Sequence, residues 1–346
     1  MMNQQKILVI GSFKNKADDK HSTTAAEQLA DLFISNNIEI ITTTTEFKKI
    51  PKFFDTLKTI YFQRKNFSIA IVPLYGTAPS FLWQQAATKL LRFLNKKIIL
   101  IVHGGSIPQQ LQSGKKFFLN AMQRANIVVA PSPFFKTVLQ QYAVDAVVIP
   151  NVLNLSNYAF QNKNAFAPNI MWMRSFSKVY NPFMAINVAV NLKKKYPFFK
   201  MIMAGTDGGL FEATKKLAEQ NDVQNNILFT GYISTEQKNK LAIECDIYIN
   251  TNNIDNAPVS VIEFMALGLP VISTNCGGIP YIIKNNENGL LVDVNDAEAM
   301  ANKIEKIITD QQFAKTISQN AFQYSRQYGE EIVFKKWMEV LNKLNN

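Results

Sequence analysis

The sequence contains few of the residues that build disulfide frameworks or metal sites. Its 346 residues include two cysteines, Cys245 and Cys276, and two histidines, His21 and His103. Two cysteines cannot form the framework of a small secreted protein, and the four residues lack the spacing of a metal site. We therefore expect a protein of a reducing compartment with no structural or catalytic metal.

Long hydrophobic runs are also missing. Hydrophobic residues make up 47% of the chain, but no run approaches the roughly 20 residues that span a membrane. The first apolar run, in KILVIGSF, has four residues before Gly11, which is typical of a first strand and too short for a signal peptide. We expect a cytoplasmic protein, with any membrane contact peripheral and on the inner face of the cytoplasmic membrane.

Acidic residues are scarce in the first half of the chain. Residues 1–166 hold 19 lysines and arginines against 8 aspartates and glutamates, whereas residues 167–346 hold 18 of each sign. A basic half indicates an anionic partner, such as membrane lipid, a phosphorylated acceptor or nucleic acid; a solvated lysine-rich surface is the alternative. Nucleic acid is disfavoured because there is no recognised motif and the aromatic residues are not interleaved with the cations.

Strand and helix patterns alternate along the chain, which predicts parallel sheets with helices on both faces. A first series extends from KILVIGSF (6–13) to VVIP (147–150), and a second begins at IMWM (170–173). Residues 154–168 between them are rich in Asn and lack periodicity, so we interpret them as an interdomain linker. The expected fold class is α/β, with two doubly wound Rossmann-like domains and ligands at the carboxyl ends of their strands.

The most informative stretch runs from Asp255 to Gly278, DNAPVSVIEFMALGLPVISTNCGG. It predicts a helix that Asn256 caps and that apolar residues surround on most sides, as in a protein interior. Ser260 and Glu263 interrupt the apolar pattern and share one helix face. Because unpaired N–H groups at a helix start suit a phosphate, the pattern predicts a diphosphate pocket flanked by acids. A core helix with one polar edge is the alternative.

Two acids separated by seven residues, Asp255 and Glu263, followed by GLPVIST, resemble the donor-site signature of retaining GT-B glycosyltransferases, most closely the large bacterial family four. The first acid of that signature is usually Glu and is Asp here. The resemblance implies an N-terminal acceptor-binding domain over residues 1–160 and a nucleotide-sugar donor domain over 161–328. A C-terminal helix, 329–346, would cross back to the N-terminal domain.

The resemblance also implies roles for residues of the predicted helix. Glu263 would accept hydrogen bonds from the ribose hydroxyls, for which a carboxylate has two acceptor oxygens. Asp255 would hold hydroxyls of the donor sugar near the reacting centre. Val259 and Ser260 would offer their N–H groups to the diphosphate.

A diphosphate-binding cation is expected where the first strand of the second domain ends. Arg174 follows that strand, and a guanidinium can bind two phosphate oxygens at once. In the resembling family a lysine follows this arginine, and both hold the donor diphosphate. Lys178 is the nearest candidate here, and Tyr180 takes the position if the loop has one extra residue. An exposed loop charge is the alternative for Lys178.

Other strand ends supply the remaining candidates. Gly205, Tyr232 and Ile233 follow strands of the second domain, where they would contact the nucleotide base; plain strand-to-helix turns are the alternative. In the first domain, the resemblance implies that His103 faces the donor sugar and helps to position the reacting centre, and that Gly11 covers the diphosphate. A strand-end histidine bonded to nearby backbone is the alternative for His103.

Together these parts imply retaining transfer of a hexose-type sugar from a nucleotide-diphospho-sugar, with a UDP-sugar favoured. The acceptor would be a glycan or a lipid-linked glycan in cell-surface polysaccharide or lipopolysaccharide assembly. A front-face mechanism then requires neither metal nor further cofactor, because Arg174 and the helix start stabilise the leaving group. The basic and apolar helix over 80–95 is a candidate for contact with an anionic membrane surface; an ordinary core-facing helix is the alternative.

Two further classes of function are considered. A dinucleotide-dependent oxidoreductase is disfavoured because neither GSFKNK nor RSFSKV, which follow the leading strands of the two domains, has the Gly-x-Gly-x-x-Gly pattern. A GT-B ligand-binding or scaffold protein that has lost catalysis is the second, since Asp255 and the position of Lys178 depart from the usual signature.

Overall fold

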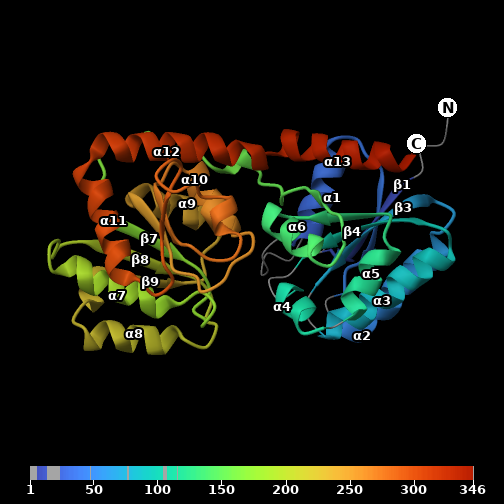
Figure 1. The fold of residues 1–346 in the computed structure, drawn as a ribbon, viewed down its shortest axis with the longest axis horizontal. Coiled ribbons are helices and arrows are strands. Elements are labelled where there is room, and N and C mark those ends of the chain that lie inside the picture. Colours follow the sequence, from blue (N-terminus) through green and yellow to red (C-terminus); the bar gives the residue numbers. More distant parts are fainter. Residues whose placement is uncertain are drawn as a thin grey trace. The chain divides into compact units, whose positions relative to one another are not determined.

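The chain folds into two units (Figure 1). Unit 1 comprises Met1–Val152 and Glu330–Asn346, and unit 2 comprises Leu153–Gly329. Within the described residues, each unit is built on a six-stranded parallel sheet with helices on both faces, which confirms the expected α/β class with two doubly wound domains. The computed structural model describes residues 6–13, 24–46, 48–75, 78–103, 107–114 and 116–345. No helix in these ranges is both long and apolar enough to cross a membrane.

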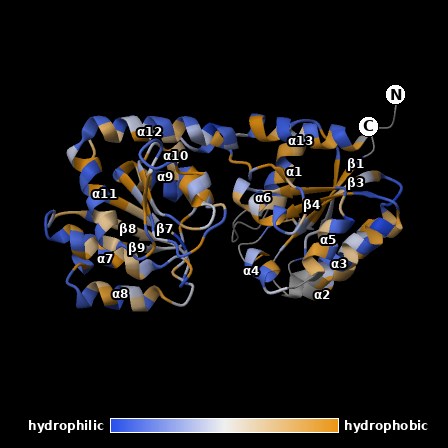
Figure 2. Ribbon diagram, in the orientation of Figure 1, coloured by the Kyte–Doolittle hydropathy of each residue, from blue (hydrophilic) through white to orange (hydrophobic). Residues whose placement is uncertain are grey.

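Unit 1 has the strand order β2-β1-β3-β4-β5-β6. Figure 2 shows hydrophobic colouring along the strands of its sheet, as expected for a sheet covered on both faces. Its strands are β1 (Lys6–Ser12), β2 (Ile40–Thr44), β3 (Phe67–Leu74), β4 (Lys97–Val102), β5 (Ile127–Ala130) and β6 (Val147–Val148). Its described helices are α1 (Ala25–Ser35), α2 (Lys49–Phe62), α3 (Ala78–Phe93), α4 (Ile107–Gln112), α5 (Lys116–Arg124), α6 (Pro133–Gln140) and α13 (Glu330–Asn345).

Helix α13 completes the core of unit 1. Val333, Trp337 and Leu341 lie in the same buried cluster as Val9 of β1 and Phe33 of α1. The rings of Trp337 and Phe33 meet edge to face, with centroids 5.8 Å apart and planes at 87°. The last helix therefore belongs to unit 1, although the chain reaches it from unit 2.

Helices α4 and α5 are separate because Gly114 has a φ of 75° that an α-helix cannot continue through. One segment of the chain differs from expectation. Residues 154–168 are not a free linker, since Tyr158 and Phe166 are buried in the cores of unit 2. The two units consequently meet along the chain at 152–153, and not at the expected boundary of 160.

Helix α3 faces the core with most of the apolar side chains that made it a membrane candidate. Trp83 and Leu91 are buried against the sheet, while Leu82 and Phe93 are exposed. The side chain of Phe81 lies outside the described part of the structure. Taken alone, α3 is therefore an ordinary core-facing helix.

Unit 2 has the strand order β12-β11-β10-β7-β8-β9, so β7 lies next to β10. Alternate residues of its strands enter opposite cores: Ile170 and Trp172 of β7 face one, and Met171 faces the other. Its strands are β7 (Asn169–Met173), β8 (Lys200–Ala204), β9 (Ile227–Gly231), β10 (Ile247–Asn250), β11 (Val271–Thr274) and β12 (Leu290–Val292). Its α-helices are α7 (Pro182–Lys193), α8 (Phe211–Gln220), α9 (Thr235–Glu244), α10 (Val259–Ala266), α11 (Ala297–Thr309) and α12 (Gln311–Ser325).

Replacing Trp337 by Ala tests how much unit 1 depends on α13. Trp337 is 4% exposed, and truncating a buried Trp to Ala costs about 3–5 kcal/mol of unfolding free energy. Ile332→Ala is the matched control because Ile332 lies on the same helix but is 41% exposed, and we expect it to change stability by less than about 1 kcal/mol. Denaturant unfolding measures both, and hydrogen exchange locates the loss. Equal effects of the two substitutions would show that α13 is not part of the core.

Candidate functional site

The strand order of unit 2 brings the candidate donor residues to one place. β7 and β10 are neighbours, and the helices that follow them, α7 and α10, pack into cores on opposite faces of the sheet. Ligands of open α/β sheets bind at the carboxyl ends of strands at such a reversal. Arg174 follows β7, whereas Asp255 and α10 follow β10. These residues, which are far apart in sequence, therefore meet at the expected ligand position.

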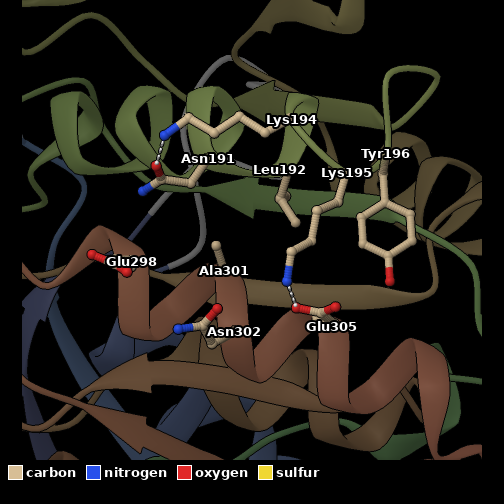
Figure 3. A pocket seen from close by; sticks show the side chains of 9 residues that line it. All are labelled: Asn191, Leu192, Lys194, Lys195, Tyr196, Glu298, Ala301, Asn302 and Glu305. Atoms are coloured by element: carbon tan, nitrogen blue, oxygen red, sulfur yellow. Dashed lines mark hydrogen bonds and ion pairs between the residues drawn. The ribbon is translucent and has the colours of Figure 1, made fainter.

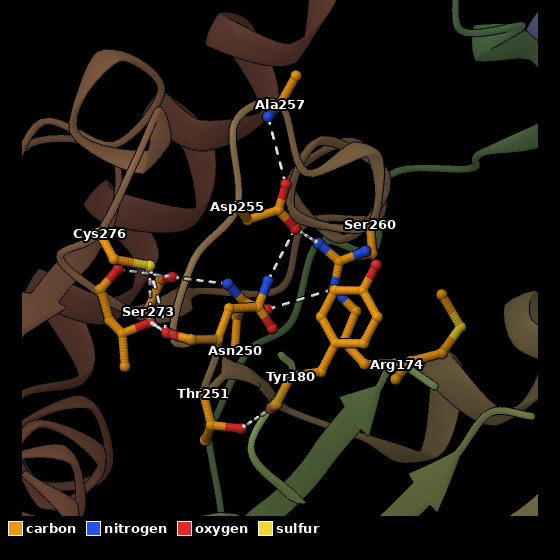
Figure 4. A network of polar contacts seen from close by, with 12 residues as sticks. Arg174, Tyr180, Asn250, Thr251, Asp255, Ala257, Ser260, Ser273 and Cys276 are labelled. Carbon is orange, nitrogen blue, oxygen red and sulfur yellow. Dashed lines mark hydrogen bonds and ion pairs between the residues drawn. The ribbon is translucent and has the colours of Figure 1, made fainter. Parts of the chain in front are cut away.

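Arg174 is held from three sides (Figure 4). Its guanidinium forms an ion pair with the Asp255 carboxylate, and its Nε lies 3.4 Å from Oδ1 of Asn250. The guanidinium carbon lies 4.8 Å from the centre of the Tyr180 ring. Burial is the largest single influence and lowers the pKa of Arg174, but Asp255, Tyr248, Tyr180 and Glu263 together outweigh it and the pKa is raised. Arg174 is therefore a fixed cation at the end of β7.

Both carboxylate oxygens of Asp255 are bound by protein groups. Its Oδ2 accepts from Arg174 and from the Asn252 amide at 2.8 Å, and its Oδ1 accepts from the N–H of Ala257 at 3.2 Å. The structure thus shows Asp255 as the residue that orients Arg174. Its expected contact with donor-sugar hydroxyls stays a prediction.

The start of α10 carries no side-chain cap. Pro258 is the N-cap residue and its side chain cannot accept a hydrogen bond, so within the described residues the expected cap by Asn256 is not formed. The first N–H groups of a helix have no partner within the helix, which leaves those of Val259 and Ser260 for a ligand. The Ser260 hydroxyl is buried and lies 2.9 Å from the hydroxyl of Tyr248, so Ser260 offers its backbone rather than its side chain.

Glu263 has two partners that sequence reasoning missed. Its Oε1 accepts from the Tyr158 hydroxyl and from Nζ of Lys238, both at 2.7 Å. Tyr158 lies in the segment interpreted as a linker, and Lys238 lies on α9. The sequence held one signal for Lys238. Lys238 and Ala242 are four residues apart and so share one helix face. In the structure they are the buried residues of α9.

The residues of unit 2 that are candidates for contact with the nucleotide base lie at the ends of β8 and β9. Gly205 has a φ of 149°, and a Cβ there would lie 1.8 Å from the carbonyl oxygen of Arg174. Its N–H donates to the Gly231 carbonyl at 2.7 Å. Tyr232 is exposed, and Ile233 packs partly against the core that contains α10. Gly205 is thus required by backbone packing, and contact of these residues with a base stays a prediction.

Of the two residues considered for the lysine position, Tyr180 contacts Arg174 and Lys178 does not. The Lys178 side chain is exposed, and its carbonyl accepts from the Asn253 amide at 2.7 Å. Its loop is therefore anchored by backbone, while the ammonium group lies in solvent. A part for Lys178 in binding diphosphate stays a prediction.

The two candidates of unit 1, His103 and Gly11, lie at the ends of strands that are not adjacent in its sheet, because β3 lies between β4 and β1. His103 follows β4, its N–H donates to the Leu74 carbonyl at 2.7 Å, and its ring stacks with Tyr75 at 5.8 Å between centroids. Burial lowers the pKa of His103 to about 4, so the imidazole is neutral at pH 7. The Gly11 N–H donates to the Thr43 hydroxyl, and that hydroxyl donates to the Gly11 carbonyl. Residues 14–23 and the glycines after His103 lie outside the described residues, and roles for His103 and Gly11 stay predictions.

Two other observations bear on the location of a site. A groove of about 250 Å³ lies between α7 and α11, where Lys195 pairs with Glu305 at 2.7 Å (Figure 3), but none of the candidate residues lines it. Among the described residues, no group of three or more His, Cys, Asp or Glu side chains could hold a metal ion. The candidate donor residues of unit 2 thus gather at the β7–β10 position and not at this groove.

Replacing Gly205 by Ala tests the close packing beneath Arg174. Gly209→Ala is the matched control, because Gly209 also has a positive φ, 95°, but has open space around its Cβ position. Both variants carry backbone strain, and only Gly205→Ala adds a collision, so we expect it to lose about 1–3 kcal/mol more unfolding free energy. Denaturant unfolding compares the two, and equal losses would contradict the packing argument.

The second unit matches a known family. Residues 159–324 match the family model described as glycosyl transferases group 1. The chain is 28% identical over 151 residues to an uncharacterized glycosyltransferase of Haemophilus influenzae, covering 43% of this chain and 42% of that protein. It is 26% identical to the lipopolysaccharide core biosynthesis glycosyltransferase LpsE of Rhizobium meliloti, covering 39% of each.

A third relative is N,N'-diacetylbacillosaminyl-diphospho-undecaprenol alpha-1,3-N-acetylgalactosaminyltransferase of Campylobacter jejuni, 27% identical over 30% of this chain and 28% of that protein. The chain thus spans less than half the length of each of these three curated relatives. Among solved structures, HepE of Anabaena in complex with UDP superposes with a TM-score of 0.76 at 17% identity, covering 98% of this chain and all of HepE.

The sequence match and the structural match agree on the architecture. The family match lies in unit 2, over the segment that contains Arg174, Asp255 and Glu263. The structural match extends over both units and shows the GT-B fold. Residues 159–324, which lie in unit 2, therefore belong to the glycosyl transferases group 1 family.

Proposed function

We propose that this protein is a retaining glycosyltransferase that takes a hexose-type sugar from a nucleotide-diphospho-sugar, with a UDP-sugar favoured. The observation that carries the proposal is the meeting of Arg174 with the uncapped start of α10 at the β7–β10 position. A cation and free N–H groups together form a site for a diphosphate. That HepE, with the same fold, was solved with UDP supports this choice of ligand.

The mechanism depends on stabilising the leaving group. Negative charge develops on the departing nucleoside diphosphate, and Arg174 with the N–H groups of Val259 and Ser260 would balance it without a metal. Because Asp255 and Tyr180 already orient the guanidinium, little reorganisation accompanies the reaction. The acceptor hydroxyl would attack on the face from which the leaving group departs, which retains the anomeric configuration.

The remaining candidates have supporting roles in the proposal. Glu263 would bind the ribose through its Oε2, since Oε1 is occupied. Gly205, Tyr232 and Ile233 would lie beside the base, and Lys178 would add charge near the diphosphate. From unit 1, His103 would act as a neutral hydrogen-bonding group beside the donor sugar, and Gly11 would lie near the diphosphate.

A diphosphate-specific role of Arg174 can be measured directly. In isothermal titration with UDP, GDP, ADP and NAD, we expect one nucleoside diphosphate to bind. Arg174→Met should weaken it by about 10–100-fold, because a hydrogen bond to a charged group contributes about 1.5–3 kcal/mol. Binding of the matching nucleoside, which lacks phosphate, should not change.

Lys195→Met, in the groove of Figure 3, is the control for loss of a cation elsewhere on unit 2 and should leave binding intact. Binding of NAD alone would contradict the proposal and favour an oxidoreductase. Binding of none of the four ligands would favour a scaffold protein that has lost its donor site.

We also propose a glycan or lipid-linked acceptor, in assembly of cell-surface polysaccharide or lipopolysaccharide. The names of the Rhizobium meliloti and Campylobacter jejuni relatives support this setting. The acceptor would approach unit 1, whose half of the chain carries all the excess positive charge. An acceptor carried by a lipid requires the enzyme to work beside a membrane.

The surface of unit 1 formed by α2 and α3, which we call the α2–α3 face, has the composition for that contact. Residues 48–97 include 10 lysines and arginines and one acid, Asp55. Ile50, Phe54 and Phe62 of α2 are exposed, as are Leu82 and Phe93 of α3, and the two helices pack side by side. Exposed apolar side chains among cations fit an anionic lipid surface. Helix α3, which the sequence indicated as the candidate for membrane contact, thus contributes only part of this face.

Sedimentation with lipid vesicles tests the α2–α3 face. We expect the protein to pellet with phosphatidylglycerol vesicles but not with phosphatidylcholine, and more weakly at high salt because exposed charges are screened. The double substitution Phe54→Glu and Phe62→Glu should abolish pelleting, since both rings are about two thirds exposed, at 65% and 66%. Phe198→Glu is the control, because Phe198 is 91% exposed but lies on unit 2. Equal losses in both variants would contradict the proposed surface.

A further inference from the structure

Two polar side chains from separate segments meet at one oxygen of Glu263. The Tyr158 hydroxyl and Nζ of Lys238 each lie 2.7 Å from Oε1, and Nζ lies 3.3 Å from the Tyr158 hydroxyl. Lys238 is 4% exposed and Tyr158 is 8% exposed. No hydrogen bond to Oε2 occurs among the described residues. The carboxylate is thus bound on one oxygen by the protein and presents the other.

Stability alone does not account for this arrangement. Taking a lysine and a carboxylate out of water costs several kcal/mol per ion, and well-packed apolar residues of similar volume are often as stable or more so. Lys238 occupies the buried face of α9 beside Ala242, where an apolar residue would serve packing. The charge of Lys238 therefore calls for an explanation in terms of what it does to Glu263.

The chemistry of the Tyr158 contact makes the arrangement directional. Burial and the neighbouring Glu263 carboxylate both raise the pKa of the Tyr158 phenol. The hydroxyl consequently keeps its proton and acts as a donor to Glu263. An ammonium group has no acceptor, so Lys238 also acts only as a donor. Both contacts fix the same oxygen and leave the acceptor sites of Oε2 unoccupied.

The three residues also connect the parts of the candidate nucleotide site. α9 begins directly after Tyr232 and Ile233, and the Ser234 hydroxyl caps it by accepting from the N–H of Gln237 at 3.2 Å. Lys238, one turn into α9, therefore ties the segment proposed to meet the base to the residue proposed to meet the ribose.

We propose that Lys238 and Tyr158 are positioning residues for ribose recognition: they hold Oε1 of Glu263 so that Oε2 accepts from the ribose hydroxyls of the donor. This inference rests on the proposed function of Glu263. It goes beyond that function in assigning the selectivity for a ribose over a deoxyribose to two residues that need not touch the nucleotide. A carboxylate that is free to rotate would lose conformational entropy when it binds the ribose. The two donors avoid this cost because they hold the carboxylate before binding.

The test compares binding of UDP with binding of 2′,3′-dideoxy-UDP, which lacks both hydroxyls, by titration calorimetry. If the base proves not to be uracil, the matching pair of diphosphates replaces these. The wild type should prefer the ribose form by about tenfold or more, because a hydrogen bond to a charged group is lost in the dideoxy form. In Lys238→Met the preference should fall by about tenfold, and in Tyr158→Phe by severalfold. Affinity for the dideoxy form should stay within about twofold in both.

A matched control separates positioning from general damage. Lys163→Met breaks another mostly buried ion pair of unit 2, Lys163 with Asp246 at 2.8 Å, which does not include Glu263. It should lower the unfolding free energy in the same way as Lys238→Met but leave the preference for ribose unchanged. Loss of the preference in Lys163→Met would contradict the inference, because destabilisation alone would then explain the effect.

The outcomes distinguish the inference from the function on which it rests. If Glu263→Ala abolishes the ribose preference and Lys238→Met keeps it, the inference is wrong and the role of Glu263 stands. If the wild type binds UDP and its dideoxy form equally, Glu263 does not recognise ribose and both fall. If Lys238→Met loses affinity for both ligands equally, Lys238 is structural and the inference is wrong.

Discussion

The ion pair between Arg174 and Asp255 joins the two strands on which the candidate site depends. Arg174 follows β7 and Asp255 follows β10, so the pair spans the point where the strand order of unit 2 reverses. Both side chains are mostly buried, and breaking a buried pair leaves an uncompensated charge that costs about 3–5 kcal/mol. The shorter Asp in place of the usual Glu is consistent with this role, since both of its oxygens bind protein groups. A diphosphate that reaches Arg174 meets a cation whose position is already set.

The second ion pair, between Lys238 and Glu263, fixes a charged side chain in the same way, one turn after the start of α10. α10 is short and almost entirely buried, so its one carboxylate needs a partner inside unit 2. Each pair leaves one group able to meet a ligand: the guanidinium at the start of α10 and Oε2 of Glu263 beside it. The helix start itself adds N–H groups without a side-chain cap. The site is therefore arranged before the ligand arrives, which reduces the entropy lost on binding.

The parts that could be predicted are those with a local signal. The apolar run IMWM located β7, the apolar helix pattern between Pro258 and Gly268 located α10, and a carboxylate in that helix identified Glu263. Tyr158 and Lys238 were missed because they lie 105 and 25 residues from Glu263, and such contacts are set by tertiary packing. The cap of α10 was mispredicted for a related reason, since Asn256 is buried and only the packed structure shows that Pro258 begins the helix. Local propensity is a weak prior at such positions.

The segment 154–168 shows how composition misleads when a few side chains decide the outcome. Its asparagines suggested a flexible linker, yet Phe160 packs against Phe322 with ring centroids 4.5 Å apart, and Lys163 pairs with Asp246. Bending within this segment would break these contacts and the bond from Tyr158 to Glu263. The contact that orients Glu263 thus makes this segment part of the packed structure of unit 2 and not a free connection between the units.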